Sequence, residues 1–227
     1  MLRPQLNALA ITISSFVAVT TLMSSTAEAV LSLSLNDGGA SVTVTDDDND
    51  GILLFTDPLS VFDANTTTVF SKPLLLGSPT AIDLNSINSS GAAGTLIIEA
   101  SDTDFTYPSS YLNFGIGGTT NNEVTYEAFV NTDNGDPFLG TLIASGNASN
   151  LTNTGAFSDA QRLSIDLDGT TPYSLGIRIT IEHGAGRQIS SFDSELRVPE
   201  PGSLGLLGTG LVLAGLMLQR RRRVRRG

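Results

Sequence analysis

A short acidic segment of the chain carries the residue types that bind a hard cation. Carboxylates alternate within the run 46–51 (DDDNDG), and Asp57 follows six residues after its glycine. In a twelve-residue calcium loop, side-chain oxygens come from positions 1, 3, 5 and 12, and a glycine at position 6 allows a sharp turn. Numbered from Asp46, the segment fills all of these positions. The predicted calcium ligands are Asp46, Asp48, Asp50 and Asp57.

Two features of this segment differ from the usual calcium loop and leave a second interpretation open. Asp57 is shorter than the bidentate glutamate that usually occupies position 12. The flanking stretches 42–45 and 52–55 resemble β-strands, whereas the usual loop lies between helices. The alternative is an acidic hairpin tip without a bound ion, on a body that is acidic throughout.

His183 is the only histidine of the chain, and there is no cysteine. The lack of cysteine excludes a disulfide framework, a thiolate metal site and a cysteine nucleophile. A serine triad would need His183 together with a carboxylate and a strained serine, but no Gly-x-Ser-x-Gly motif occurs. His183 ends a predicted strand before Gly184-Ala185-Gly186, so we expect it in an exposed turn. The sequence therefore predicts no catalytic residue.

Glycoside hydrolysis and sugar binding are further alternatives. A carboxylate pair could be drawn from the glutamates in or beside the predicted strands, which are Glu99, Glu123, Glu127, Glu182 and Glu195. The chain has no tryptophan to form a sugar platform, so hydrolysis is disfavoured. Carbohydrate binding without catalysis would use tyrosine rings, although the core is the default position for each of them. The candidates are Tyr107, Tyr111, Tyr126 and Tyr173.

Charge is distributed unevenly over the 227 residues. Residues 30–198 carry 21 acidic and five basic side chains, a net charge of −16, whereas residues 199–227 carry one glutamate and six arginines. A body of this charge repels phosphate backbones, so nucleic-acid binding is excluded.

Period-two alternation dominates residues 30–198. Leu31, Leu33 and Leu35 alternate with serines, and the run 175–181 places leucine and isoleucines at every second position. Each such stretch predicts a strand with one buried and one exposed face. Turn signals such as Asn36-Asp37-Gly38-Gly39 separate roughly ten to twelve short strands, and no helical period is found. The predicted fold is all-β, an antiparallel β-sandwich of jelly-roll type in one domain.

The N-terminal segment 1–29 has the organisation of a secretory signal peptide. Arg3 precedes a mostly apolar run over 6–23, and Ala27-Glu28-Ala29 has the small-x-small pattern of a signal peptidase site. Polar residues interrupt the run, which disfavours a permanent membrane anchor. We therefore expect export through the Sec translocon and cleavage after Ala29.

The C-terminal segment 199–227 has three parts in a fixed order. Pro199-Glu200-Pro201 is followed by the uncharged stretch 202–219, which as a helix would measure about 27 Å, close to the thickness of the hydrocarbon core. A basic cluster follows and should stay in the cytoplasm, since positive charge sets membrane orientation. Its residues are Arg220, Arg221, Arg222, Arg223, Arg225 and Arg226. The expected precursor is a single-span membrane protein with its body outside.

This combination over Val198–Gly227 resembles the PEP-CTERM sorting signal of Gram-negative bacteria. The resemblance implies that an exosortase, a membrane-embedded enzyme similar to a cysteine transpeptidase, recognises Pro199, Glu200 and Pro201. It further implies cleavage near that motif and release or transfer of the body to the cell surface. Proteins of this kind tend to accompany exopolysaccharide production. The stretch 83–106 also resembles the bodies of some PEP-CTERM proteins, which supports the fold without adding an activity.

The sequence as a whole predicts an exported, non-enzymatic surface protein. Its expected partners are the Sec translocon, signal peptidase, the inner membrane before processing, the exosortase and an exopolysaccharide or biofilm matrix. Two alternatives are kept: a calcium- or carbohydrate-binding surface module, and a secreted hydrolase.

Overall fold

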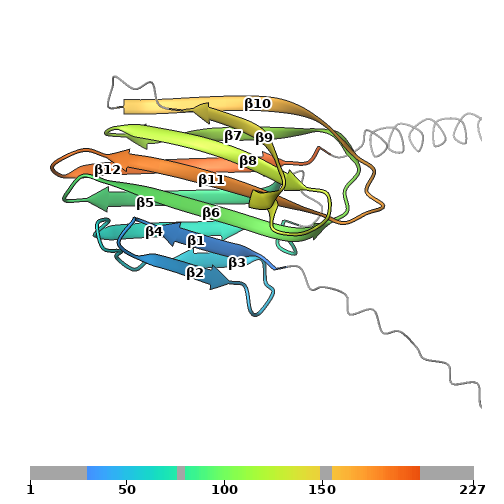
Figure 1. Cartoon of the computed structure of the whole chain (residues 1–227), viewed down its shortest axis with the longest axis horizontal. Coiled ribbons are helices and arrows are strands. Elements are labelled where there is room, and N and C mark those ends of the chain that lie inside the picture. Colours follow the sequence, from blue (N-terminus) through green and yellow to red (C-terminus); the bar gives the residue numbers. More distant parts are fainter. Residues whose placement is uncertain (1–29, 76–79, 149–154, 200–227) are drawn as a thin grey trace, which may run out of the picture.

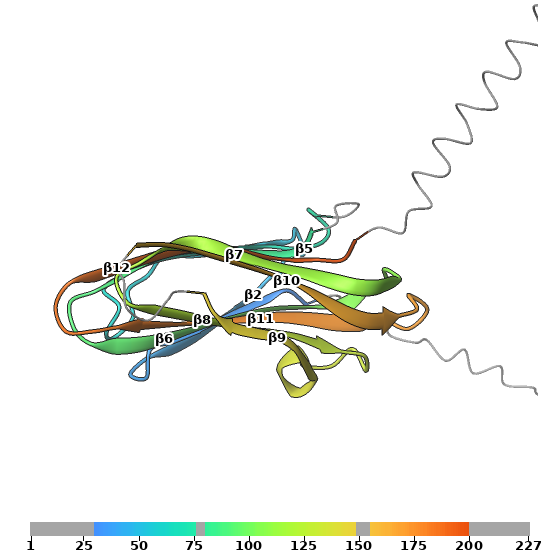
Figure 2. The same cartoon turned by 90° about the horizontal axis from the view of Figure 1, so that it is seen from above.

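Two six-stranded antiparallel sheets pack face to face in the computed structural model, which describes residues 30–75, 80–148 and 155–199 (Figures 1 and 2). Sheet A has the order β2-β1-β6-β11-β8-β9 and sheet B the order β10-β7-β12-β5-β4-β3. The strands of sheet A are β1 (Ser32–Asn36), β2 (Ser41–Thr45), β6 (Gly94–Phe105), β8 (Glu123–Asn131), β9 (Thr141–Asn147) and β11 (Tyr173–His183). Those of sheet B are β3 (Ile52–Phe55), β4 (Ala64–Phe70), β5 (Thr80–Ser90), β7 (Ser109–Thr120), β10 (Gly155–Leu167) and β12 (Gln188–Arg197).

The strand order is that of a jelly roll with two added hairpin arms. Strands β5 to β12 form the eight-stranded pattern, with β5-β12-β7-β10 in one sheet and β6-β11-β8-β9 in the other. Strands β1 and β2 extend sheet A beyond β6, and β4 and β3 extend sheet B beyond β5. The predicted antiparallel sandwich of jelly-roll type is confirmed.

The core lies between the sheets and is built from the apolar face of each alternating strand. Leu33 and Leu35 of β1 and Ile177 and Ile179 of β11 are completely buried. Phe114 of sheet B stacks on Tyr126 of sheet A with ring centroids 4.5 Å apart, which joins the two layers directly. Burial of each large side chain stabilises the fold by about 1.5–3 kcal/mol, so alternation in the sequence translates directly into sheet packing.

Several strands are longer than the short strands that the turn signals suggest. Strands β6, β7, β10 and β11 have 11 to 13 residues. In the part of the chain that the structure describes, the helical content is one 3₁₀ turn, Pro137–Leu139, capped by the Asp136 side chain. The prediction that the body has no α-helix holds for these residues.

Part of the interior is polar. Asn65 and Thr67 of β4 face Ser86 and Asn88 of β5, and all four are buried. The Asn65 amide donates to Asn88 Oδ1 at 2.5 Å, the Thr67 hydroxyl lies 2.7 Å from Ser86 Oγ, and the Asn88 amide donates to Ser86 Oγ at 2.8 Å. Because the buried groups bond one another, this cluster is compatible with an interior position.

Candidate functional site

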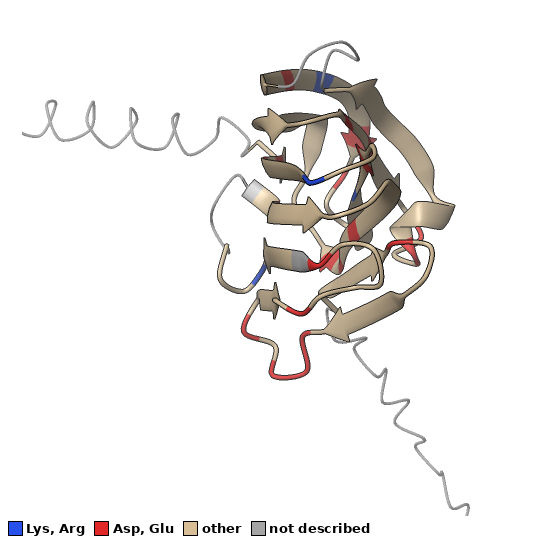
Figure 3. Cartoon of the chain, turned by 90° about the vertical axis from the view of Figure 1, so that its left-hand side faces the viewer, with Lys and Arg blue, Asp and Glu red and all other residues tan. Residues whose placement is uncertain are grey.

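The predicted calcium loop forms the connection between β2 and β3, where the chain passes from sheet A to sheet B (Figure 3). Gly51 ends the loop with φ of 81°, and a Cβ on it would lie 2.8 Å from the Ser71 carbonyl oxygen. A glycine is therefore required there by both backbone conformation and space. The Gly51 N–H donates to Asp46 Oδ2 at 2.8 Å, which folds the first carboxylate back over the loop.

Three of the four predicted ligands converge. Oxygens of Asp46, Asp48 and Asp50 lie within 4.8 Å of one another. A hydrogen bond with Asp46 and the negative charge of Asp50 raise the pKa of Asp48. Such crowding of like charges is relieved when a cation binds between them.

Asp57 is not part of this group. The residues that separate it from Gly51 include β3, which is extended, and a strand advances about 3.3 Å per residue. The strand therefore carries Asp57 away from the turn, whereas a helix after the loop would bring position 12 back toward the ion. The calcium prediction stays untested for Asp46, Asp48 and Asp50, and the geometry gives no support to Asp57 as a fourth ligand.

We expect calcium to stabilise the full chain through this loop. A hundredfold excess over Kd should raise the Tm by roughly 5 °C, because an ion that binds only the folded loop shifts the unfolding equilibrium. Differential scanning fluorimetry against sodium at matched ionic strength measures the calcium-specific part. Asp48→Asn with Asp50→Asn should abolish that part, and Asp57→Asn should retain it. Equal curves in calcium and sodium would mean that the loop is an acidic hairpin tip.

His183 is buried, so the expectation of an exposed turn histidine is wrong. Its exposed fraction is 3%, and it faces the core as the last residue of β11. Nδ1 lies 2.8 Å from Ser90 Oγ, and Nε2 lies 2.8 Å from Ser190 Oγ. Ser90 also donates to the Ala92 carbonyl, so Ser90 accepts from Nδ1–H and Nε2 accepts from Ser190. Burial lowers the pKa of His183, which favours the neutral ring at physiological pH.

The signal for this burial was present in the sequence. Leu175, Ile177, Ile179 and Ile181 share the parity of His183, so continued alternation places its ring inside. The following glycines suggest that the strand ends at Glu182, one residue before its actual end at His183.

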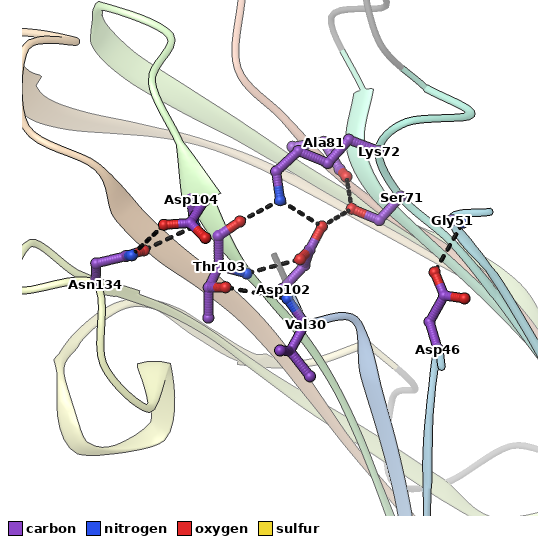
Figure 4. Close-up of polar contacts among 10 residues, drawn as sticks. All are labelled: Val30, Asp46, Gly51, Ser71, Lys72, Ala81, Asp102, Thr103, Asp104 and Asn134. Carbon is purple, nitrogen blue, oxygen red and sulfur yellow. Dashed lines mark hydrogen bonds and ion pairs between the residues drawn. The ribbon is translucent and has the colours of Figure 1, made fainter. Parts of the chain in front are cut away.

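A second buried polar group connects the segment directly after β4 with β6 (Figure 4). Asp102 accepts hydrogen bonds from the Ser71 hydroxyl at 2.6 Å and from Lys72 Nζ at 2.9 Å. Lys72 also donates to the Thr103 carbonyl and lies 4.4 Å from the centroid of the Phe105 ring. Burial raises the pKa of Asp102, while Lys72 and Ser71 oppose that shift. Sequence reasoning missed this ion pair, because its partners are 30 residues apart and show no motif.

The glutamates considered for hydrolysis are distributed over both sheets. Glu99 and Glu127 both bind Arg178, at 2.7 and 2.9 Å, on the outer face of sheet A. Glu195 pairs with Arg197 at 2.7 Å on sheet B. Glu123 accepts from the Asn147 amide at 2.6 Å. Glu99, Glu127 and Glu123 thus contact residues of neighbouring strands, as surface cross-strand pairs do. Glu195 contacts a residue of its own strand.

The tyrosine candidates are poorly placed for sugar stacking. Tyr126 and Tyr173 are core residues, at 1% and 2% exposure. The Arg162 guanidinium covers the Tyr111 ring at 3.6 Å from its centroid, and Tyr107 is partly buried against the core. The core position expected by default is confirmed for Tyr126 and Tyr173.

The sandwich ends where the C-terminal motif begins. β12 finishes at Arg197, Val198 is a core residue, and Pro199 is half-buried. The predicted signal peptide 1–29, including Ala27 and Ala29, lies outside the described residues, as do Glu200, Pro201, the span 202–219 and the arginine cluster. Among the residues that the structure does describe, no helix is long and apolar enough to cross a membrane.

These features define a jelly-roll β-sandwich whose last strand leads directly into a short C-terminal segment. The model of the PEP-CTERM protein-sorting motif matches residues 197–223. The chain therefore carries a PEP-CTERM sorting signal, which implies processing by an exosortase and an exported, membrane-anchored precursor.

Among curated proteins, no match to the sequence was found. Among solved structures, the enzymatically active domain of tailspike protein 4 from bacteriophage CBA120 is similar at 12% identity and a TM-score of 0.37, over 66% of this chain and 19% of the tailspike. The K1 cleaved adhesin domain of Lys-gingipain from Porphyromonas gingivalis is similar at 13% identity and a TM-score of 0.31, over 76% of this chain and 99% of that domain. CBM27-1 of Caldicellulosiruptor saccharolyticus, solved with mannohexaose, is similar at 10% identity and a TM-score of 0.32, over 66% and 92%. The strand order defines the jelly-roll fold.

Proposed function

We propose that this protein is a non-catalytic structural component of the cell surface or of an exopolysaccharide or biofilm matrix. In this scheme the precursor is exported through Sec and loses residues 1–29 to signal peptidase. The span 202–219 holds it in the inner membrane with the arginine cluster in the cytoplasm. An exosortase then cleaves near Pro199-Glu200-Pro201, and the body passes to the surface.

The junction between β12 and the sorting motif carries this proposal. The matched motif begins at Arg197, the last residue of β12, and the core includes Val198. Cleavage at or after Pro199 would thus leave the sandwich complete. The prolines favour an extended chain that an active-site cleft can accept.

The absence of catalysis in this proposal is supported by the position of the only histidine. His183 is enclosed between Ser90 and Ser190, which are both completely buried, so its ring is out of reach of a substrate. The glutamates Glu99 and Glu127 are engaged by Arg178. A screen of the purified protein against glycosidase and esterase substrates tests this part, and turnover that co-purifies with the protein through successive chromatographic steps would contradict it.

A second candidate function is calcium binding at the surface. The convergence of Asp46, Asp48 and Asp50 favours it. The melting experiment above decides between this site and an acidic turn.

We expect the mature protein to lack both ends of the chain. Intact-mass measurement of protein recovered from the cell surface should give a species that begins near Val30 and ends near Pro199–Pro201. Protein from cells that lack the exosortase is the control and should keep the C-terminal segment. Recovery of the Arg220–Arg226 tail on wild-type surface protein would show a permanent anchor in place of processing.

A further inference from the structure

A hollow of about 360 Å³ lies on the outer face of sheet B, across β4, β5, β12 and β7. This face is uppermost in Figure 2. Strand register aligns one row of its lining residues in the order Thr68, Asn85, Asp193 and Gly117. At a strand spacing of about 4.8 Å, four strands give the hollow a length of roughly 14 Å. We call this hollow the β7 groove.

The second row of the β7 groove adds hydroxyl and apolar groups. Thr66, Ile87 and Ser191 are aligned in it, and Ile87 has 59% of its surface exposed. The groove thus combines hydroxyl and amide groups, a single carboxylate and one exposed apolar side chain. This combination suits a ligand that offers many hydroxyl groups along its edges and C–H groups on its faces.

Gly117 forms part of the floor of the groove, although the fold does not require glycine there. Its φ is not positive, and the nearest atoms to an added Cβ would be Phe157 O at 3.6 Å and Ser158 Cβ at 3.9 Å. By contrast, a Cβ on the neighbouring Gly118 would lie 2.0 Å from Ser191 O, so packing requires that glycine. A glycine inside a strand weakens it and often marks a place where a ligand approaches the backbone closely. Gly117 fits that description, because the lack of a side chain at this position leaves the floor of the groove open.

The carboxylates beside the groove restrict the charge that its ligand can carry. Asp83 lies opposite Glu195 in the register, and Asp193 is two residues from Glu195 on the same face of β12. Burial and the charge of Glu195 raise the pKa of Asp193, and burial and the charge of Asp193 raise that of Asp83. The nearby Arg197 is engaged by Glu195. A polymer of uronate, sulfate or phosphate groups would be repelled from this side of the groove.

We propose that the β7 groove binds an uncharged polysaccharide strand. The ring hydroxyls would bond to Asn85, Ser191 and Asp193, and a sugar face would lie over Gly117 beside Ile87. The proposal rests on the proposed function only for the place at which the protein would encounter such a polymer, the cell surface or matrix. Binding itself does not depend on it, because the groove belongs to the folded body.

The test compares two glycine-to-valine variants on the same strand and the same face. Gly117→Val should fill the groove and reduce affinity at least about tenfold. Gly115→Val is the matched control: its Cβ would make ordinary contact with Glu195 at 3.7 Å, and Gly115 does not line the groove, so affinity should stay within about twofold of wild type. Valine is a good strand residue, so melting curves should show both variants folded.

Binding is measured with the full chain in a zwitterionic detergent that has no sugar headgroup, by calorimetric titration with neutral glucan, galactan and mannan oligosaccharides. Polyuronate and amino-sugar oligomers are run beside them. Binding of a neutral oligomer that Gly117→Val abolishes and Gly115→Val retains supports the groove. The proposal is overturned if no neutral oligomer binds, if Gly117→Val binds as tightly as the wild type, or if a charged oligomer is preferred. Each of these outcomes is independent of whether an exosortase processes the chain.

Discussion

Replacing Glu200 and Pro201 with alanine should trap the body on the membrane with its C-terminal segment uncleaved, while export continues normally. The proposed span 202–219 and the arginine cluster remain in this variant, so the chain should stay anchored when the exosortase cannot recognise the motif. Fractionation followed by intact-mass measurement should find the tail on nearly all of the variant and on little of the wild type.

Matched substitutions outside the motif provide the control. Ser203→Ala and Leu204→Ala lie just beyond Pro201 and should be processed like the wild type. If the Glu200 and Pro201 variant reaches the surface with a wild-type C-terminus, the motif is not what the enzyme reads.

Asp37→Ala should produce the largest loss of stability among the substitutions considered. Asp37 is 4% exposed, and its carboxylate accepts from Ala40 N at 2.8 Å, Ser60 Oγ at 2.7 Å and Val61 N at 2.5 Å. It joins the β1–β2 turn to the segment that leads into β4. This segment contains the buried Phe62, whose ring lies next to His183. Leaving these donors unpaired should cost about 3–5 kcal/mol of unfolding free energy, measured by urea denaturation.

Asp168→Ala is the matched control, because Asp168 makes similar bonds to Thr170 and Thr171 within one exposed turn. Its effect on the urea midpoint should be small. A small effect of Asp37→Ala as well would show that the turn does not depend on the carboxylate.

The same carboxylate predicts a pH dependence. Burial tends to raise the pKa of Asp37, but hydrogen bonds from Val61, Ser60 and Ala40 outweigh burial and hold that pKa well below its usual value. A lowered folded-state pKa means that its stabilisation is complete at neutral pH and is lost progressively as the pH falls from about 5 toward 2. Asp37→Asn should therefore narrow the difference between unfolding free energies at pH 7 and pH 3. An unchanged difference would assign the acid sensitivity to other carboxylates.

Hydrophobic alternation was sufficient to predict the fold class and much of the core. The leucines of β1 and the isoleucines of β11 are buried where period two places them, because a strand presents alternate residues to one layer. The same reasoning fails on β5, where Ile87 is exposed and the adjacent Asn88 is buried. Asn88 is buried because Asn65 and Ser86 satisfy its amide, and Asn65 reaches it only through the pairing of β4 with β5.

The candidate sites could be predicted where their residues are close in sequence, and could not where strand pairing brings the residues together. Asp46, Asp48 and Asp50 are close in sequence and held on one tight turn, so their convergence could be read from spacing. The displacement of Asp57 depends on β3 being a strand. The sequence predicts a strand over 52–55, but the expectation of a ligand at position 12 does not take into account that an extended segment carries Asp57 away from the loop. The β7 groove could not be predicted, because its lining comes from four strands brought together by the jelly-roll order.

Sheet B is completed by the last strand of the body. β12 lies between β5 and β7, and Ser194 Oγ donates to the Leu84 carbonyl, 110 residues earlier in the chain. Pairings over such separations form slowly, because a long loop must close before the contacts are gained. In the proposed export route, sheet B cannot close until β12 has crossed the membrane, so we expect the sandwich to fold after export and not during it. We expect the C-terminal tail to tether the unfolded chain during this interval, so that folding is finished before the body is released.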